Sequence, residues 1–115
     1  MVDWFRWWAP TMSIDSRLLF SIANGAYLNG DAIARARQMA KLKASGLVPA
    51  VPDLELALPT RLWPGMFIEM KRQDGRATPE QIDMLSLLRG RGYNCILALG
   101  ADEAIRAIKG YVAGR

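Results

Sequence analysis

Two short segments, Val51-Pro52-Asp53-Leu54 and Phe67-Ile68-Glu69-Met70-Lys71, decide the predicted fold of this chain. Residues 53–57 and 66–71 alternate side chains between two faces, which is typical of half-buried strands. Prolines and a glycine lie between them, at Pro59, Pro64 and Gly65. These residues favour a connection, so the two strands are predicted to form a hairpin.

The sequence after this hairpin predicts a helix, a third strand and a last helix. Thr78-Pro79-Glu80-Gln81 supplies a capping residue, a proline at the first helical position and a glutamine three residues after the cap. This helix should run to about Gly90, and residues 93–99 should form a strand parallel to 66–71 through a right-handed crossover. A last helix, about residues 102–111, should bury Ala104, Ile105, Ile108 and Val112.

The sequence before the hairpin predicts further helices. Asp31 can cap a helix over residues 32–44, which is rich in alanine and ends at Ser45-Gly46. Residues 1–29 favour one or two short helices followed by a loop. The predicted class is therefore α/β, with a small mixed central β-sheet flanked by α-helices.

Length and composition predict one globular domain over residues 1–115. The chain has 51% apolar and 23% charged residues, which is the composition of a globular protein. Its apolar runs are far shorter than the roughly 18 residues that a membrane span needs, and no secretion signal is expected because Asp3 and Arg6 interrupt the N-terminal aromatic residues. We expect a cytoplasmic protein of a bacterial or phage-infected host cell.

The chain contains one cysteine, Cys95, and no histidine. An intramolecular disulfide, a thiolate metal cluster and histidine-based catalysis are therefore excluded, and Cys95 is expected in the core. Any catalysis must use carboxylates, amines or hydroxyls.

The net charge of +4 is uneven, because residues 1–50 carry six basic and three acidic side chains whereas the rest carry nine and eight. This excess permits attraction to a polyanion without requiring one. Arg37 and Lys41 are four residues apart and share a helical face. That face is either an ordinary solvated surface or a contact with DNA phosphates.

Asp53, Glu69 and Lys71 form the candidate catalytic group. Glu69 and Lys71 are two apart on one strand and project from the same face, and Asp53 comes from the neighbouring strand. Two carboxylates and a backbone carbonyl suit Mg²⁺ or Mn²⁺, and a nearby ammonium group can stabilise charge on a phosphate. The chemistry would be metal-assisted phosphodiester hydrolysis. The alternative is a surface ion pair and a Pro-Asp turn.

An ordered set of motifs resembles the virus-type replication-repair nuclease (VRR-NUC) family of the PD-(D/E)xK superfamily. The resemblance covers nearly the whole chain. Its pieces are residues 23–25, Lys41 to Leu47, Val51 to Leu54, Phe67 to Arg72, Gly75, Gln81, Gly92-Tyr93, Gly100 to Ala104, Ile108 and Tyr111. It implies a restriction-endonuclease-like core and a metal-dependent endonuclease that cuts DNA.

The resemblance assigns roles to individual residues. Asp53, Glu69 and the main-chain carbonyl of Met70 would be metal ligands, Lys71 would orient the attacking water, and Gln81 would assist in the active site. Gln81 has a second interpretation, as the capping-box partner of Thr78. The predicted DNA-binding residues are Arg37, Lys41, Lys43 and Arg72, and Asn24 and Gly25 are expected to shape the edge of the cleft.

The resemblance also places a glutamate on the first helix, before the segment that matches Val2-Asp3-Trp4, and this chain begins after that position. The first-helix ligand is therefore unassigned. The alternative function is a DNA-binding or interaction domain that keeps the nuclease fold with impaired catalysis. By analogy with junction resolvases, we expect a homodimer that acts on branched or structured DNA.

Two further sets of side chains have open interpretations. Glu55 shares a face with Asp53, and it is either an extra ligand or, as we favour, part of an ion pair. The tryptophans could stack on unpaired bases or, as we favour, cover a core or a subunit interface; they are Trp4, Trp7 and Trp8.

Overall fold

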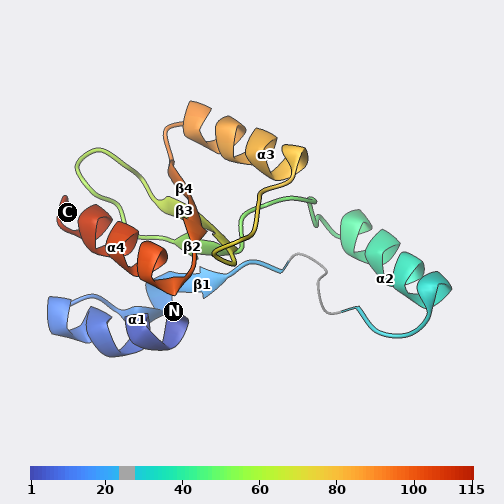
Figure 1. The fold of residues 1–115 in the computed structure, drawn as a ribbon, viewed down its shortest axis with the longest axis horizontal. Helices are drawn as coiled ribbons and strands as arrows, with labels where there is room; N and C mark the ends of the chain where they lie inside the picture. The colour runs from blue at the N-terminus through green and yellow to red at the C-terminus, as the bar shows by residue number, and fades with distance from the viewer. Residues whose placement is uncertain (24–27) are drawn as a thin grey trace.

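The structure is a computed structural model that describes residues 1–23 and 28–115 (Figure 1). Its helices are α1 (Val2–Trp8), α2 (Ala32–Ala44), α3 (Pro79–Gly90) and α4 (Ala101–Val112), with short 3-10 turns at Ala9–Met12 and Ser16–Leu18. Its strands are β1 (Leu19–Ser21), β2 (Leu54–Leu56), β3 (Met66–Lys71) and β4 (Asn94–Leu99). No described helix combines the length and the apolar character that crossing a bilayer requires.

The four strands form one mixed sheet in the order β1-β2-β3-β4. β2 and β3 pair antiparallel, with Glu55 opposite Phe67, and β3 and β4 pair parallel, with Glu69 opposite Leu97. The predicted hairpin, the parallel crossover and the α/β class are thus confirmed. The strand β1 was not predicted; it pairs antiparallel with β2 and extends the sheet beyond the hairpin.

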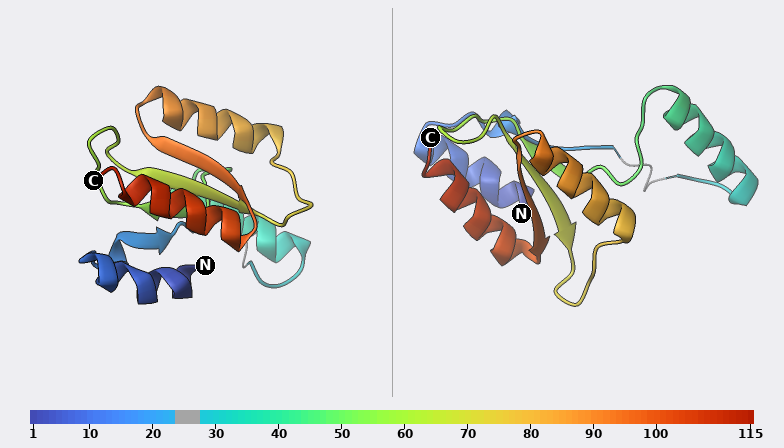
Figure 2. Two further views of the ribbon diagram at one scale, coloured as in Figure 1. Left: turned by 60° about the vertical axis from the view of Figure 1, so that its left-hand side comes forward. Right: turned by 90° about the horizontal axis from the view of Figure 1, so that it is seen from above.

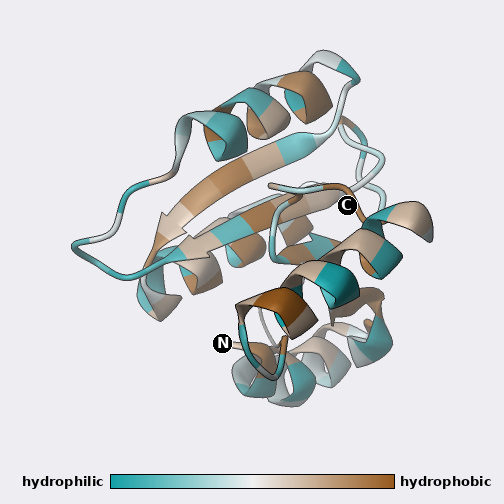
Figure 3. Ribbon diagram, turned by 90° about the vertical axis from the view of Figure 1, so that its right-hand side faces the viewer, coloured by the Kyte–Doolittle hydropathy of each residue, from teal (hydrophilic) through white to brown (hydrophobic). Residues whose placement is uncertain are grey.

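Helices cover the two faces of the sheet unequally. α1 and α4 lie on one face and α3 lies on the other (Figures 1 and 2). The main core is between the sheet and the α1/α4 layer, and the helices that line it carry both apolar and polar residues (Figure 3). Its largest fully buried side chains are Phe5, Leu56, Met66, Ile68, Ile108 and Val112. Since Leu54, Leu56 and Ile68 point into this core, alternation turns Asp53, Glu55 and Glu69 toward the α3 face.

The last helix differs from its prediction in two side chains. Ala104, Ile108 and Val112 are buried as expected, but Ile105 is only half-buried. Tyr111 is buried instead, and its hydroxyl donates a hydrogen bond to the carbonyl of Leu58 over 2.7 Å. This bond ties α4 to the connection between β2 and β3.

The N-terminal tryptophans divide between the core and the surface. Trp4 and Trp8 stack on each other with ring centroids 4.9 Å apart, and both pack against the main core. Trp7 is 70% exposed. The interpretation as core aromatics therefore holds for Trp4 and Trp8, and not for Trp7.

The helix α2 has the predicted bounds. The Asp31 carboxylate accepts a hydrogen bond from the Ala34 N–H over 2.8 Å and caps its start, and Gly46 follows its end with φ +111°, a conformation that glycine adopts without strain. The helix buries no residue, and it stands apart from the sheet and the other helices (Figure 1). Its helicity was therefore predictable, but its detachment was not.

Candidate active site

Asp53 lies at the entrance to β2 and is held by two backbone hydrogen bonds. Its side-chain Oδ2 accepts a hydrogen bond from the Met70 N–H over 2.8 Å. Its main-chain carbonyl accepts another from the Ile22 N–H, also over 2.8 Å, just beyond the end of β1. The carboxylate predicted from the Pro-Asp motif is thus fixed against the strand that carries the other predicted site residues.

Glu69 is a buried carboxylate next to a partly buried cation. Its side chain is 3% exposed, and its Oε1 lies 3.3 Å from the Nζ of Lys71, which is 20% exposed. Burial raises the pKa of Glu69, the Asp53 carboxylate raises it further, and Lys71 opposes the shift. The structure therefore brings Asp53, Glu69 and Lys71 together, as the strand spacing predicted.

The backbone of Met70 completes a set of oxygen donors. The Met70 N–H points at Asp53, and the N–H and carbonyl of one strand residue point to the same side. The Met70 carbonyl therefore also faces the β2 side of β3. It lies two residues beyond Ile68, which forms the last residue pair of β2 and β3 with Leu54. Two carboxylates and a carbonyl are hard oxygen ligands of the kind that Mg²⁺ and Mn²⁺ prefer.

These donors fit a divalent cation, because two carboxylates held this close repel each other and a cation relieves the repulsion. Within residues 1–23 and 28–115, no three Asp, Glu, Cys or His side chains gather in one place. Water or substrate oxygens, which Mg²⁺ commonly retains, would complete its coordination.

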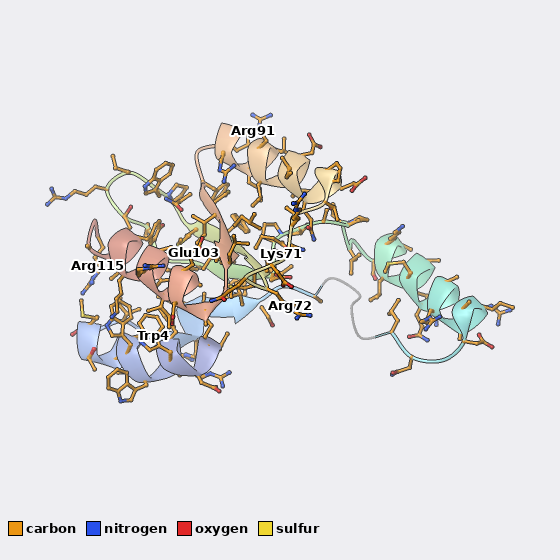
Figure 4. The ribbon with its side chains drawn as sticks, in the orientation of Figure 1. Trp4, Lys71, Arg72, Arg91, Glu103 and Arg115 are labelled. Carbon is orange, nitrogen blue, oxygen red and sulfur yellow. The ribbon has the colours of Figure 1, made fainter. Side chains whose placement is uncertain are left out.

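A tight turn follows the site strand. The Gly75 N–H donates to the Arg72 carbonyl over 2.8 Å, and a Cβ at Gly75 would lie only 3.1 Å from that carbonyl and 3.3 Å from the Cβ of Lys71. Glycine therefore allows the turn to pass close to Lys71. Lys71 and Arg72 lie on the side of the body that faces α2 (Figure 4), where Arg72 is exposed and pairs with Asp74 at 3.7 Å.

Gln81 forms the capping box of α3. Its side-chain carbonyl accepts a hydrogen bond from the Thr78 N–H over 2.9 Å, and its own N–H donates to the Thr78 hydroxyl over 3.2 Å. The capping interpretation is thus confirmed, and the role of Gln81 in catalysis stays a prediction.

The predicted DNA-binding residues lie in two places. Arg37, Lys41 and Lys43 are exposed on α2, away from the sheet, whereas Arg72 follows directly after Lys71. The predicted cleft residues Asn24 and Gly25 lie outside the described residues.

Other acidic side chains have different environments from the site pair. Asp3 and Asp15 pair with Arg6 and Arg17 on the surface. The ion pair predicted for Glu55 is not found with any described residue. In the sheet register Glu55 stands between Phe20 and Phe67, and neither of these cross-strand neighbours is basic.

The sequence interpretation missed Ile22, whose N–H fixes the backbone of Asp53. The available signal was the short apolar run Leu18-Leu19-Phe20 with Ile22 after it, in which Leu19 is buried and Phe20 and Ser21 are exposed. This run is too short to stand out from the loop that follows it.

Comparisons with known proteins agree with this arrangement. A sequence model of the VRR-NUC domain matches residues 10–102. A solved structure described as a VRR_NUC domain protein superposes with a TM-score of 0.76 at 22% identity, and the match covers 98% of this chain and 86% of that one. A comparison with curated proteins gives no match. The resemblance seen in the motifs is therefore confirmed, and the chain belongs to the VRR-NUC domain family.

Proposed function

We propose that this chain is a divalent-metal-dependent endonuclease that hydrolyses DNA phosphodiester bonds, with residues 1–115 acting as one nuclease domain. VRR-NUC is a nuclease-type family, which supports the reaction class. The observation that carries the proposal is the convergence of Asp53 and Glu69, from two strands, beside the Nζ of Lys71.

Asp53, Glu69 and the Met70 carbonyl would hold Mg²⁺ or Mn²⁺. When bound, the ion would polarise the scissile phosphate and lower the pKa of the attacking water. The backbone bonds to Asp53 keep its carboxylate in place before substrate arrives, so little reorganisation is needed at the moment of reaction.

Lys71 supplies the fixed positive charge of the site. Its contact with Glu69 holds the ammonium group on the face of the sheet that carries both carboxylates. From there Lys71 can donate a hydrogen bond to the attacking water and stabilise the negative charge that develops on the phosphate oxygens. The predicted assistance from Gln81 would come from the first turn of α3, which follows the loop that leaves β3 after Lys71.

The proposed substrate is branched or structured DNA, cut by a homodimer in the cytoplasm. Arg37, Lys41, Lys43 and Arg72 would contact its phosphates. Two copies would offer one active site for each of two strands. Sedimentation at micromolar concentration tests the assembly, and an active monomer would remove the dimer from the proposal.

The test of the reaction is cleavage of supercoiled plasmid and of four-way junctions with Mg²⁺ or Mn²⁺. We expect nicking by the wild type, loss of nicking in Asp53→Ala and Lys71→Ala, and retention in Asp83→Asn, which changes an exposed carboxylate on α3. Equal nicking by all four proteins would indicate a contaminant and reject the proposal.

A second candidate, a DNA-binding domain without cleavage, is favoured by the small number of acidic ligands. Only two carboxylates converge among the described residues. This candidate predicts that the wild type binds junctions equally in EDTA and in Mg²⁺ and leaves them intact.

A further inference from the structure

The whole net charge of the chain resides on α2. The sequence has 15 basic and 11 acidic residues, and residues 32–44 contain four of the basic ones and no acidic one. The remaining 11 basic and 11 acidic side chains balance, and one of these acidic side chains is Asp31 at the N-cap of α2, so residues 32–44 carry the full +4. These four cations are Arg35, Arg37, Lys41 and Lys43.

The cations of α2 are available to a partner. All four side chains are exposed, and none forms an ion pair with a described residue. The cations next to the candidate site, Lys71 and Arg72, are both paired. Among the described residues, the polar support given to α2 comes from its caps and from Gln38, whose side chain exchanges two hydrogen bonds with the backbone of Asn29.

A free helix of this length is a poor stable element by itself. Helices of about 12 to 15 residues are marginal in water unless packing stabilises them, and α2 has 13 residues and buries none. Since its four charged side chains are all positive, the complementary partner is a polyanion. An exposed Ile33 is the largest apolar side chain that α2 offers to a protein surface.

The helix is tethered at the candidate active site. One connection to α2 leaves the sheet after β1, and the other returns to the sheet at Asp53. The hydrogen bond between the Ile22 N–H and the Asp53 carbonyl joins these two connections where they meet the sheet. α2 therefore stands beyond the end of the sheet that carries Asp53, Glu69 and Lys71 (Figures 1 and 4). Its length of about 20 Å matches about six base pairs of B-DNA.

We infer that α2 is a DNA-gripping arm, which binds the phosphates of a duplex segment beside the scissile bond and supplies most of the sequence-independent affinity. This inference rests on the proposed nuclease function and adds a division of labour to it. The body performs the chemistry, and the charged arm holds the DNA. Arg37 and Lys41 share one face and bind the same duplex segment, and Lys43, on another side of the helix, adds a further phosphate contact.

Salt dependence of DNA binding measures this grip directly. The arm variant replaces all four cations of α2 with glutamine, which keeps the helix propensity close to that of lysine and arginine. A matched variant, Arg6→Gln with Arg61→Gln, Arg91→Gln and Arg106→Gln, removes the same charge from exposed positions of the body. A third variant exchanges arginine and lysine within the arm and keeps its charge. Binding to a labelled duplex is followed by fluorescence anisotropy in EDTA.

The arm variant should lose at least the two contacts of Arg37 and Lys41. Each phosphate contact contributes about 0.9 to the slope of log affinity against log salt, so the slope should fall by about 2 and the affinity roughly 60-fold at about 0.1 M salt. The body variant and the charge-keeping variant should retain the wild-type slope. Circular dichroism checks that α2 remains helical in each protein.

Two outcomes would contradict the inference that α2 binds the DNA. Equal losses in the arm and body variants would mean that general charge, not α2, binds DNA. An unchanged slope together with conversion of a wild-type dimer into a monomer would mean that α2 joins two copies instead.

The two proposals can fail separately. Metal-dependent nicking with an unchanged slope in the arm variant rejects the arm alone. An arm-dependent slope without any nicking rejects the nuclease alone, and a wild type that binds no DNA rejects both.

Discussion

Two substitutions of Asp53 separate its hydrogen bond to the backbone from its negative charge, because asparagine removes the charge alone and alanine removes the charge and the acceptor. Asparagine keeps an oxygen that can accept the 2.8 Å hydrogen bond from the Met70 N–H, but it carries no charge. Alanine removes both the charge and the acceptor. Loss of a hydrogen bond to a charged group costs about 1.5 to 3 kcal/mol, and relief of the repulsion between Asp53 and Glu69 offsets part of this cost.

In EDTA we therefore expect Asp53→Ala to lower the free energy of unfolding by about 1 to 2 kcal/mol, and Asp53→Asn to leave it unchanged or raise it. Urea titration followed by circular dichroism gives both values. With Mn²⁺ at about 100 times its dissociation constant, the wild type should gain about 2.7 kcal/mol. Neither variant should gain this amount, because each lacks a charged ligand.

Two results would refute this reasoning. Equal destabilisation by asparagine and alanine in EDTA would show that the Asp53 oxygen does not hold the Met70 N–H. A full gain in stability with Mn²⁺ in Asp53→Asn would show that the ion binds elsewhere.

Three further predictions concern the neighbouring side chains. Lys71→Met should lower the rate of nicking by about 10² to 10³, the usual cost of removing one stabilising donor, and a rate within tenfold of wild type would contradict the role of Lys71. Burial and Asp53 raise the pKa of Glu69 above its ordinary value of 4.5, so the folded state binds the Glu69 proton more tightly than the unfolded state does. The free energy of unfolding in EDTA should therefore fall as the pH rises through 4.5 toward neutrality. Glu69→Gln should flatten this dependence in urea titrations, and parallel curves for the two proteins would argue against it. Thr78→Ala and Gln81→Ala should each cost about 1 kcal/mol of stability by breaking the capping box, but only Gln81→Ala should also reduce nicking; equal rates would limit Gln81 to capping.

The sequence predicted the elements whose ends are encoded locally. α2 has the expected bounds because Asp31 caps its start and Gly46 follows its end. α3 begins at Pro79 because Thr78 and Gln81 form the expected capping box. β3 spans the expected residues because its alternation matches burial on one face.

The elements that depend on tertiary context were not predictable in the same way. β1 has three residues, and its pairing with β2 supplies the evidence that it is a strand. Helix propensity indicated that α2 is a helix but carried no information on what it packs against. The ion pair expected for Glu55 was not predictable from the sequence for the same reason. The sequence does not reveal which residues lie opposite Glu55 in the sheet, and these are Phe20 and Phe67.

The candidate site was predictable in composition and not in its bonding. Strand spacing placed Glu69 and Lys71 on one face, and the hairpin brought Asp53 alongside them. The bond from the Met70 N–H to Asp53 joins residues 17 positions apart, so the geometry of the hairpin end decides it. The same holds for the bond between Ile22 and Asp53, which depends on the unpredicted strand β1.

Anomalous scattering from crystals of the wild type soaked in Mn²⁺ tests directly whether Asp53, Glu69 and the Met70 carbonyl hold a divalent cation. We expect a manganese peak within bonding distance of the carboxylates of Asp53 and Glu69 and of the Met70 carbonyl, and no peak there in Asp53→Asn crystals. Well-ordered wild-type crystals that show manganese only at other positions would contradict this expectation.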